Sequence, residues 1–312
     1  MPALLQRRGG MVGAGLALWV ALGLVACGPR ADGGQTDGGG GPEASVPDGH
    51  VWWDGGVGPD GGDPCEPPDM LIVLDRTMSM HRMPDGDPTP QASHDLSKWY
   101  LAIDGVETVT AAYDLRLRFG LELFPRDPAD GSCVTLTERI DGTTASNVIC
   151  EAGEVLVSPD VGTSGAIDSA MDAETTLLCR STPIGEGLDT ALAHLAGIQD
   201  PIRSQFVLLV TDGGETCNDP VWRVQDLAAA GVSTFVVGFD GSGAGVDPEV
   251  LNNMACAGLT APDPAQNCVD QGGGAYVAAD PAGATLFLTA EDGPDLAAQL
   301  ESVAAAVGCI VE

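Results

Sequence analysis

Basic residues are scarce in this chain. Its 312 residues include 13 lysines and arginines against 45 aspartates and glutamates, which gives a formal net charge of -32 at pH 7. Such a charge repels nucleic acids and anionic lipid surfaces. We therefore expect no nucleic acid among the partners and an affinity for cations, although most of the acidic side chains only solvate the surface.

Motifs built on cysteine or histidine are also missing. No C-x-x-C pair occurs and only four histidines are present, so the sequence gives no sign of a zinc site. The hydrolase motif G-x-S-x-G and the metalloprotease motif H-E-x-x-H are both absent. We therefore predict that the protein is not an enzyme.

A long hydrophobic run occurs only near the N-terminus. Two arginines precede the uncharged segment 11–26, which is too short to span a bilayer comfortably and has the flanks of a secretory signal peptide. The segment ends in "LVAC", which resembles the lipobox of bacterial lipoproteins. The resemblance implies a signal peptide at 1–26, lipidation of Cys27 and, because Gly28 follows, an anchor in the outer membrane of a Gram-negative bacterium. The alternative is an ordinary signal peptide with a chance cysteine.

Residues 27–64 contain little apolar material. Glycine, aspartate and proline dominate this region, and its apolar side chains are too few to offset the chain entropy lost on folding. We predict a flexible tether that carries the lipid at Cys27. The texture changes at residue 65, and the length of residues 65–312 fits one large domain.

Short apolar runs alternate with helical patterns in that domain. Strands are predicted at 70–74, 115–124, 206–210 and 232–239, with a weaker candidate at 275–279. Helices are predicted at 96–113, 183–198, 220–230, 247–256 and 295–307. Three of the runs are continuously apolar, as in strands buried on both faces, whereas 115–124 alternates and is expected at an edge. The pattern predicts an α/β fold with a doubly wound, mostly parallel sheet, helices on both faces and one antiparallel edge strand.

The stretch "DRTMSM" follows the first predicted strand and carries an oxygen at every second position. In extended backbone Asp75, Thr77 and Ser79 point the same way. Asp212 follows the third predicted strand, and Thr182 precedes the second predicted helix. Ligands of a parallel sheet bind at the carboxyl ends of its strands, so we expect these groups to meet. Their oxygens are hard ligands that suit one divalent cation, Mg²⁺ first, with Mn²⁺ or Ca²⁺ as alternatives.

This ordered set resembles the metal-ion-dependent adhesion site of the von Willebrand factor type A domain, which combines D-x-S-x-S, a threonine and T-D-G. The resemblance covers roughly residues 69–308. It implies that hydroxyls ligate the ion directly, that carboxylates act largely through water, and that an acidic residue of the partner completes the coordination. The residues carried over are Asp75, Thr77, Ser79, Thr182 and Asp212.

The chain departs from the family pattern at two positions. Thr77 stands where serine is usual, which keeps the hydroxyl but restricts its rotamer. Met78 stands where glycine is common, so a positive φ there would be strained. A plainer interpretation is that Asp75 and Asp212 only cap loops and that Thr182 is a helix N-cap.

The function implied by the resemblance is metal-dependent binding of a protein or surface ligand that offers an acidic residue. The protein would be exported and held at the membrane by its N-terminal lipid. One alternative is a metal-free structural or assembly scaffold. Another is a metal-dependent hydrolase, for which the sequence supplies no obvious base or nucleophile.

Nine cysteines are present, and eight remain after Cys27 is set aside. An even number in an exported chain indicates disulfides, although eight cysteines allow about 105 pairings. We predict Cys179–Cys217, because this pair would clamp the loops of Thr182 and Asp212 together. The other predicted pairs are Cys65–Cys309, Cys133–Cys150 and Cys256–Cys268. The competing possibility is that Cys179 pairs with Cys133 or Cys150.

Overall fold

The computed structural model describes residues 66–90, 94–130, 132–145, 148–172, 177–239 and 246–307. The predicted signal peptide at 1–26, the tether at 27–64 and the cysteines Cys65 and Cys309 lie outside these ranges. Within the described residues, none of the helices combines the length and the apolar character that crossing a bilayer requires.

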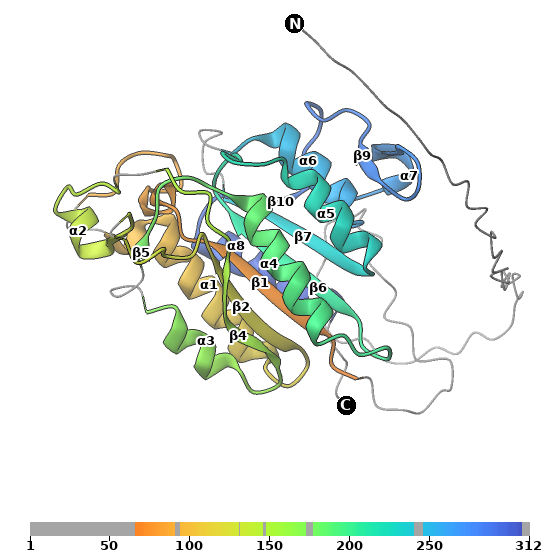
Figure 1. Cartoon of the computed structure of the whole chain (residues 1–312), viewed down its shortest axis with the longest axis horizontal. Helices are drawn as coiled ribbons and strands as arrows, with labels where there is room; N and C mark the ends of the chain where they lie inside the picture. Colours follow the sequence, from red (N-terminus) through yellow and green to blue (C-terminus); the bar gives the residue numbers. More distant parts are fainter. Residues whose placement is uncertain are drawn as a thin grey trace, which may run out of the picture. The chain divides into compact units, whose positions relative to one another are not determined.

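The core of the domain is a six-stranded sheet with the order β10-β7-β6-β1-β2-β4 (Figure 1). Its strands are β1 (Asp69–Asp75), β2 (Arg118–Phe124), β4 (Glu154–Asp160), β6 (Gln205–Thr211), β7 (Val232–Phe239) and β10 (Leu288–Ala290). All neighbours pair in parallel except β2 and β4, which are antiparallel. The mostly parallel sheet with one antiparallel strand confirms the predicted fold class.

The prediction that 115–124 is an edge strand is wrong. The strand β2 lies between β1 and β4, and β4 is the strand at that end of the sheet. The polar positions of β2 are not open to water as on an edge: Glu122 is fully buried, and the half-buried Arg118 pairs with Asp69 and Asp160. The weaker candidate at 275–279 also lies outside the main sheet, because β9 (Tyr276–Ala278) pairs with β8 (Cys268–Asp270) in a separate hairpin.

Helices cover both faces of the sheet (Figure 1). One face packs against α1 (Lys98–Tyr113), α3 (Ser164–Ala170) and α8 (Gly293–Val307). The other face packs against α4 (Ile184–Gly197), α5 (Pro220–Ala229) and α6 (Pro248–Ala257). Alternate residues of β1 point to opposite faces of the sheet: Ile72 packs on the first face and Val73 on the second. The whole run is apolar because both faces are covered.

A long excursion between β2 and α4 carries most of the small elements. They are β3 (Val134–Thr135), α2 (Leu136–Ile140) and β5 (Leu177–Leu178), in addition to β4 and α3. The remaining small elements are the short helices η1 (Met78–His81), η2 (His94–Leu96) and α7 (Pro264–Asn267). The excursion matters for function because β5 runs directly into the segment before Thr182.

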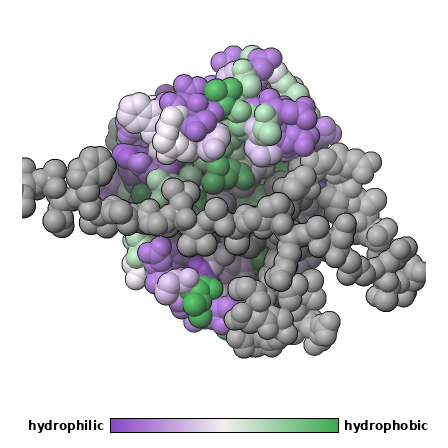
Figure 2. All heavy atoms as spheres, turned by 90° about the vertical axis from the view of Figure 1, so that its right-hand side faces the viewer, coloured by the Kyte–Doolittle hydropathy of each residue, from purple (hydrophilic) through white to green (hydrophobic). Residues whose placement is uncertain are grey.

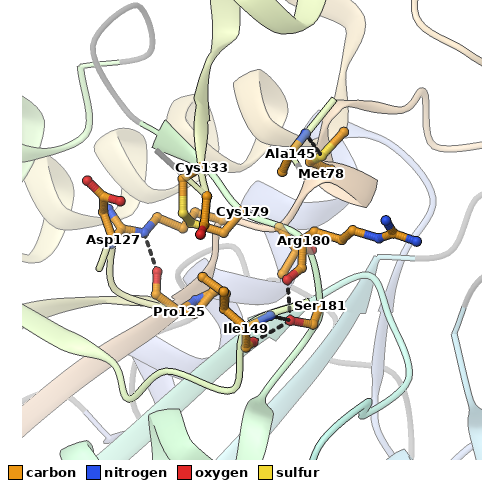
Figure 3. The surroundings of a disulfide bond; sticks show 12 residues. Met78, Pro125, Asp127, Cys133, Ala145, Ile149, Cys179, Arg180 and Ser181 are labelled. Carbon is orange, nitrogen blue, oxygen red and sulfur yellow. Dashed lines mark hydrogen bonds between the residues drawn. A yellow bond between two sulfur atoms is a disulfide. The ribbon is translucent and has the colours of Figure 1, made fainter. Parts of the chain in front are cut away.

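The disulfides differ from the main prediction. The structure joins Cys133 to Cys179 and Cys150 to Cys217, so the predicted pairs Cys179–Cys217 and Cys133–Cys150 are wrong. The cause is the antiparallel pairing of β3 with β5, which aligns Val134 with Leu178 and so sets Cys133 opposite Cys179 with their Cα atoms 4.3 Å apart (Figure 3). This outcome is one form of the competing possibility for Cys179. The local pair Cys256–Cys268 is confirmed.

On the face drawn in Figure 2, hydrophobic residues stand in small separate groups among hydrophilic ones. Single exposed hydrophobic residues are normal on a folded domain and carry no functional meaning by themselves.

Candidate functional site

Asp75 ends β1 and is fully buried at the carboxyl edge of the sheet. The parallel pairing of β1 with β6 brings Thr211 beside it, and the Thr211 hydroxyl donates a hydrogen bond of 2.7 Å to Asp75 Oδ2. The backbone N–H of Thr77 donates to Asp75 Oδ1 at 2.8 Å. Two donors from different segments therefore hold both carboxylate oxygens in place.

Three further oxygens form a continuous row next to Asp75. Thr77 Oγ1 and Ser79 Oγ share a hydrogen bond of 2.8 Å. Ser79 Oγ in turn donates to Asp212 Oδ1 at 2.8 Å. The row joins the loop after β1 to the loop after β6, so two segments far apart in the sequence meet at one point.

Thr182 lies beside this row, just before α4. A Cβ atom on Gly213 would come within 3.3 Å of the Thr182 hydroxyl oxygen, so the glycine after Asp212 leaves room for that side chain. The backbone N–H of Thr182 donates to Thr216 Oγ1 at 2.8 Å, and the backbone N–H of Thr216 donates to the Thr182 carbonyl at 3.2 Å. Thr182 is not the N-cap of α4: that position is Pro183, and the first-turn N–H of Gly185 donates instead to Glu215 Oε2 at 2.8 Å.

The site concentrates negative charge away from water. Asp75 is fully buried and Asp212 nearly so. Burial, and after it the negative charge of Asp212, raises the pKa of Asp75 to about 7, although the hydrogen bonds from Thr211 and Thr77 oppose the shift. Two buried carboxylates at one place need a cation or a proton between them.

The cation that the chain itself supplies is Lys98, which the sequence reasoning missed. Its ammonium forms an ion pair with Asp212 Oδ2, and both side chains are buried. Lys98 is the first residue of α1, directly after the N-cap Ser97, whose side chain accepts from Tyr100 N. A lysine at the start of a helix, where cations are not favoured, is an unusual choice and was the available signal.

The donor set fits a divalent metal ion. Two oxygens bound at right angles to Mg²⁺, at about 2.1 Å each, lie about 3 Å apart. The Thr77–Ser79 and Ser79–Asp212 oxygen pairs are both separated by 2.8 Å. All the donors are hydroxyl or carboxylate oxygens, which are the ligands that Mg²⁺, Mn²⁺ and Ca²⁺ prefer.

The loop that holds Thr77 is braced by the excursion. Met78 N–H donates to the Cys179 carbonyl at 2.8 Å, and Cys179 N–H donates to the Arg76 carbonyl at 3.2 Å. The disulfide to Cys133 fixes Cys179 from the other side (Figure 3). The expected strain at Met78 does not arise, because this residue is not among those with positive φ. Its sulfur accepts a hydrogen bond from Ala145 N at 3.2 Å.

Comparison with protein families finds one match. Residues 162–267 match the sequence model of the von Willebrand factor type A domain. The matched segment contains Thr182 and Asp212, whereas Asp75, Thr77 and Ser79 precede it. The comparison with curated proteins finds no match.

Comparison with solved structures finds several matches. Proximal thread matrix protein 1 from the mussel byssus is 15% identical, with a TM-score of 0.48 over 77% of this chain and 48% of that one. A von Willebrand factor type A structure from Catenulispora acidiphila is 14% identical, with a TM-score of 0.47 over 77% and 42%. The pilus adhesin SpaC from Lactobacillus rhamnosus GG in its open conformation is 12% identical, with a TM-score of 0.49 over 79% and 31%. The chain thus spans about half of the byssus protein and less of the other two.

Proposed function

We propose that the domain whose residues 162–267 match the von Willebrand factor type A model binds a protein or surface ligand through a divalent cation. The cation would be held by Asp75, Thr77, Ser79, Thr182 and Asp212. The observation that carries the proposal is the row of hydroxyl and carboxylate oxygens spaced 2.8 Å apart beside a second buried carboxylate. Mg²⁺ is the ion we propose first, with Mn²⁺ and Ca²⁺ as alternatives.

A divalent ion bound there would supply an electropositive position at which an acidic side chain of the partner can bind. The chain's own residues prepare that position. The Thr211 hydroxyl and the Thr77 amide orient Asp75, and Ser79 links the two loops. The disulfide Cys150–Cys217 attaches the loop after β6 to the excursion. The disulfide Cys133–Cys179 fixes the segment of the excursion to which the loop after β1 is hydrogen-bonded. Little chain entropy therefore remains to be lost when a ligand binds.

We also propose that the protein is exported and lipid-anchored through Cys27, in the outer membrane of a Gram-negative bacterium. The "LVAC" sequence after an apolar segment supports the anchor. Three disulfides among the described residues support an oxidising compartment. We propose binding rather than catalysis, because the sequence contains neither G-x-S-x-G nor H-E-x-x-H.

A metal-free scaffold is the second candidate, and one observation favours it. The Lys98 ammonium already pairs with Asp212 and compensates part of the buried negative charge. In this alternative the site only joins the two loops, and partner binding does not depend on metal.

Thermal melting in EDTA, Mg²⁺, Mn²⁺ and Ca²⁺ distinguishes the two candidates. We expect metal to stabilise the wild type by about 2.7 kcal/mol at a hundredfold excess over the dissociation constant. Asp75→Ala should abolish this gain.

The matched control is Asp69→Ala, because Asp69 is equally buried at the opposite end of β1 and pairs with Arg118 instead. This control should melt lower but keep its response to metal. Equal metal binding by wild type and Asp75→Ala would refute the ligand assignment, and a wild type that ignores metal would favour the scaffold.

A further inference from the structure

Among the residues that the structure describes, three arginines form no ion pair with a carboxylate, although the chain is rich in carboxylates. Other described arginines do pair, such as Arg118 with Asp69, Arg126 with Glu151, and Arg223 with Asp189. Within the described ranges, no ion pair is formed by Arg82, Arg139 or Arg180. With 45 acidic residues against 13 basic ones, pairing all of the arginines would be easy, so this exception indicates another use for them.

The three arginines line one open pocket of about 420 Å³. They come from different segments: Arg82 follows η1, Arg139 belongs to α2, and Arg180 follows β5. The pocket wall also includes Met78, Ser79 and Ala145. The assembly of cations from three separate segments gives the pocket a positive charge that the overall composition does not predict.

The pocket is continuous with the candidate metal site through Ser79. This residue lines the pocket, and its hydroxyl donates to Asp212 in the row of metal-site oxygens. Met78, the residue before Ser79, forms part of the same wall and is held by the hydrogen bond from Ala145 N (Figure 3). A ligand that reaches the metal site therefore passes beside the arginines.

The guanidinium groups of the three arginines have N–H donors that are not used in hydrogen bonds within the described residues. Arg139 Nε is buried and has no hydrogen-bond partner among the described residues. Arg82 uses Nη1 to donate to the Gly86 carbonyl at 2.9 Å, which leaves its other donors open. Arg180 is exposed, and its guanidinium extends away from the Cys133–Cys179 disulfide in Figure 3. An unsatisfied buried donor is costly, and the planar guanidinium matches a carboxylate with two parallel hydrogen bonds.

We propose that this arginine pocket binds a second acidic side chain of the ligand whose first carboxylate reaches the metal site. The ligand is thus a polypeptide segment with two acidic residues close together in its sequence. A long polyanion fits less well, because a net charge of -32 repels it over its whole length, whereas a short segment meets only the local positive charge. This inference rests on the proposed function.

The test compares capped glycine-based peptides that carry one aspartate or two aspartates separated by one, two or three glycines. Binding to the full chain is measured by calorimetry in Mg²⁺. We expect the best two-aspartate peptide to bind at least about tenfold more tightly than the one-aspartate peptide, which is the size of one added charge-assisted contact. Arg139→Gln and Arg180→Gln should remove this advantage and leave Mg²⁺ affinity and one-aspartate binding unchanged.

The matched control is Arg126→Gln, since Arg126 is an exposed arginine at the start of the same excursion and pairs with Glu151. It should bind both peptides as the wild type does.

Equal affinity for the two peptides in a protein whose binding responds to EDTA would overturn this inference but not the proposed function. Binding of the one-aspartate peptide that ignores EDTA would instead contradict the proposed function. Tighter, metal-independent binding of heparin would show that the pocket takes a sulfated polyanion and would also overturn the inference. Because Arg180 is exposed, its variant should fold even if the Arg139 variant does not.

Discussion

At the scale of single residues, Lys98 decides how the site behaves without metal. Its ammonium contacts the same carboxylate that would help to hold a divalent ion. Two cations at one carboxylate repel each other, so the lysine would compete with a bound metal ion for Asp212. The lysine also stabilises the metal-free fold, because it compensates a carboxylate that is buried.

Lys98→Met should therefore raise metal affinity and lower stability in EDTA. Removing one partner of a buried ion pair typically lowers the free energy of unfolding by about 3–5 kcal/mol. We expect this decrease in the metal-free protein. Denaturation in EDTA and in Mg²⁺ measures the two effects, and calorimetry measures the affinity. Lys98→Arg keeps the charge and serves as the control. A fall in metal affinity in Lys98→Met would show that the lysine supports the ion instead of competing with it.

At the scale of an element, strand β2 carries a buried carboxyl group of its own. Glu122 is fully buried, and neither carboxylate oxygen has a hydrogen-bond partner among the described residues. A Cβ on Gly153 would lie 1.8 Å from Glu122 Oε1, so this glycine makes room for the carboxyl group. Burial raises the pKa of Glu122 well above its ordinary value. The folded protein thus keeps a proton that the unfolded chain loses near pH 4.5.

Glu122→Gln should change how stability depends on pH. In the wild type, the folded state binds more protons than the unfolded state above the ordinary glutamate pKa, so the free energy of unfolding falls as pH rises. The slope from this group is about 1.4 kcal/mol per pH unit until the folded-state pKa is reached. The variant should lack this slope and exceed the wild type in stability at pH 8 by more than at pH 5. Urea denaturation at several pH values measures this difference. Glu301→Gln serves as the control, because Glu301 is exposed. Parallel pH profiles for wild type and Glu122→Gln would contradict it.

The disulfides distinguish site-supporting elements from purely structural ones. Cys150–Cys217 spans 67 residues and holds the loop after Asp212 against the excursion, whereas Cys256–Cys268 spans 12 residues beside the β8–β9 hairpin. Replacing both cysteines of either pair by serine should cost stability, about 4 kcal/mol for the first and about 3 kcal/mol for the second on the loop-entropy model. Only the first replacement should weaken metal binding, as measured by calorimetry. Equal metal affinity in both variants would show that the loop keeps its shape without the disulfide.

At the scale of the whole molecule, the anchor and the binding site are separate parts. The predicted lipid is attached at Cys27, and the site begins at Asp75. Cys27→Ser should release the protein from the membrane fraction, because no second lipid signal is predicted. Fractionation of cells followed by immunoblotting measures this. Asp75→Ala should stay with the membrane and serves as control. Intact Cys27→Ser protein that remains membrane-bound would place the anchor elsewhere.

Much of the domain could be predicted from local patterns. The run "MLIVL" and the strands at 206–210 and 232–239 are continuously apolar because helices cover both faces of the sheet. The candidate ligands could be found because they follow strand ends, and parallel strands end at one edge. The order of polar and apolar residues along the chain therefore determined the fold class and the grouping of the five site residues.

Only the tertiary structure decided the contacts between distant segments. Lys98 reaches Asp212 because α1 begins beside the carboxyl edge, and no spacing rule links two residues so far apart. Cys133 meets Cys179 because two strands of two residues each happen to pair, and strands that short leave no periodic signal. The arginine pocket arises in the same way, from three segments that meet only after folding. Such contacts depend on packing energies summed over the whole domain, which a local pattern of residues does not contain.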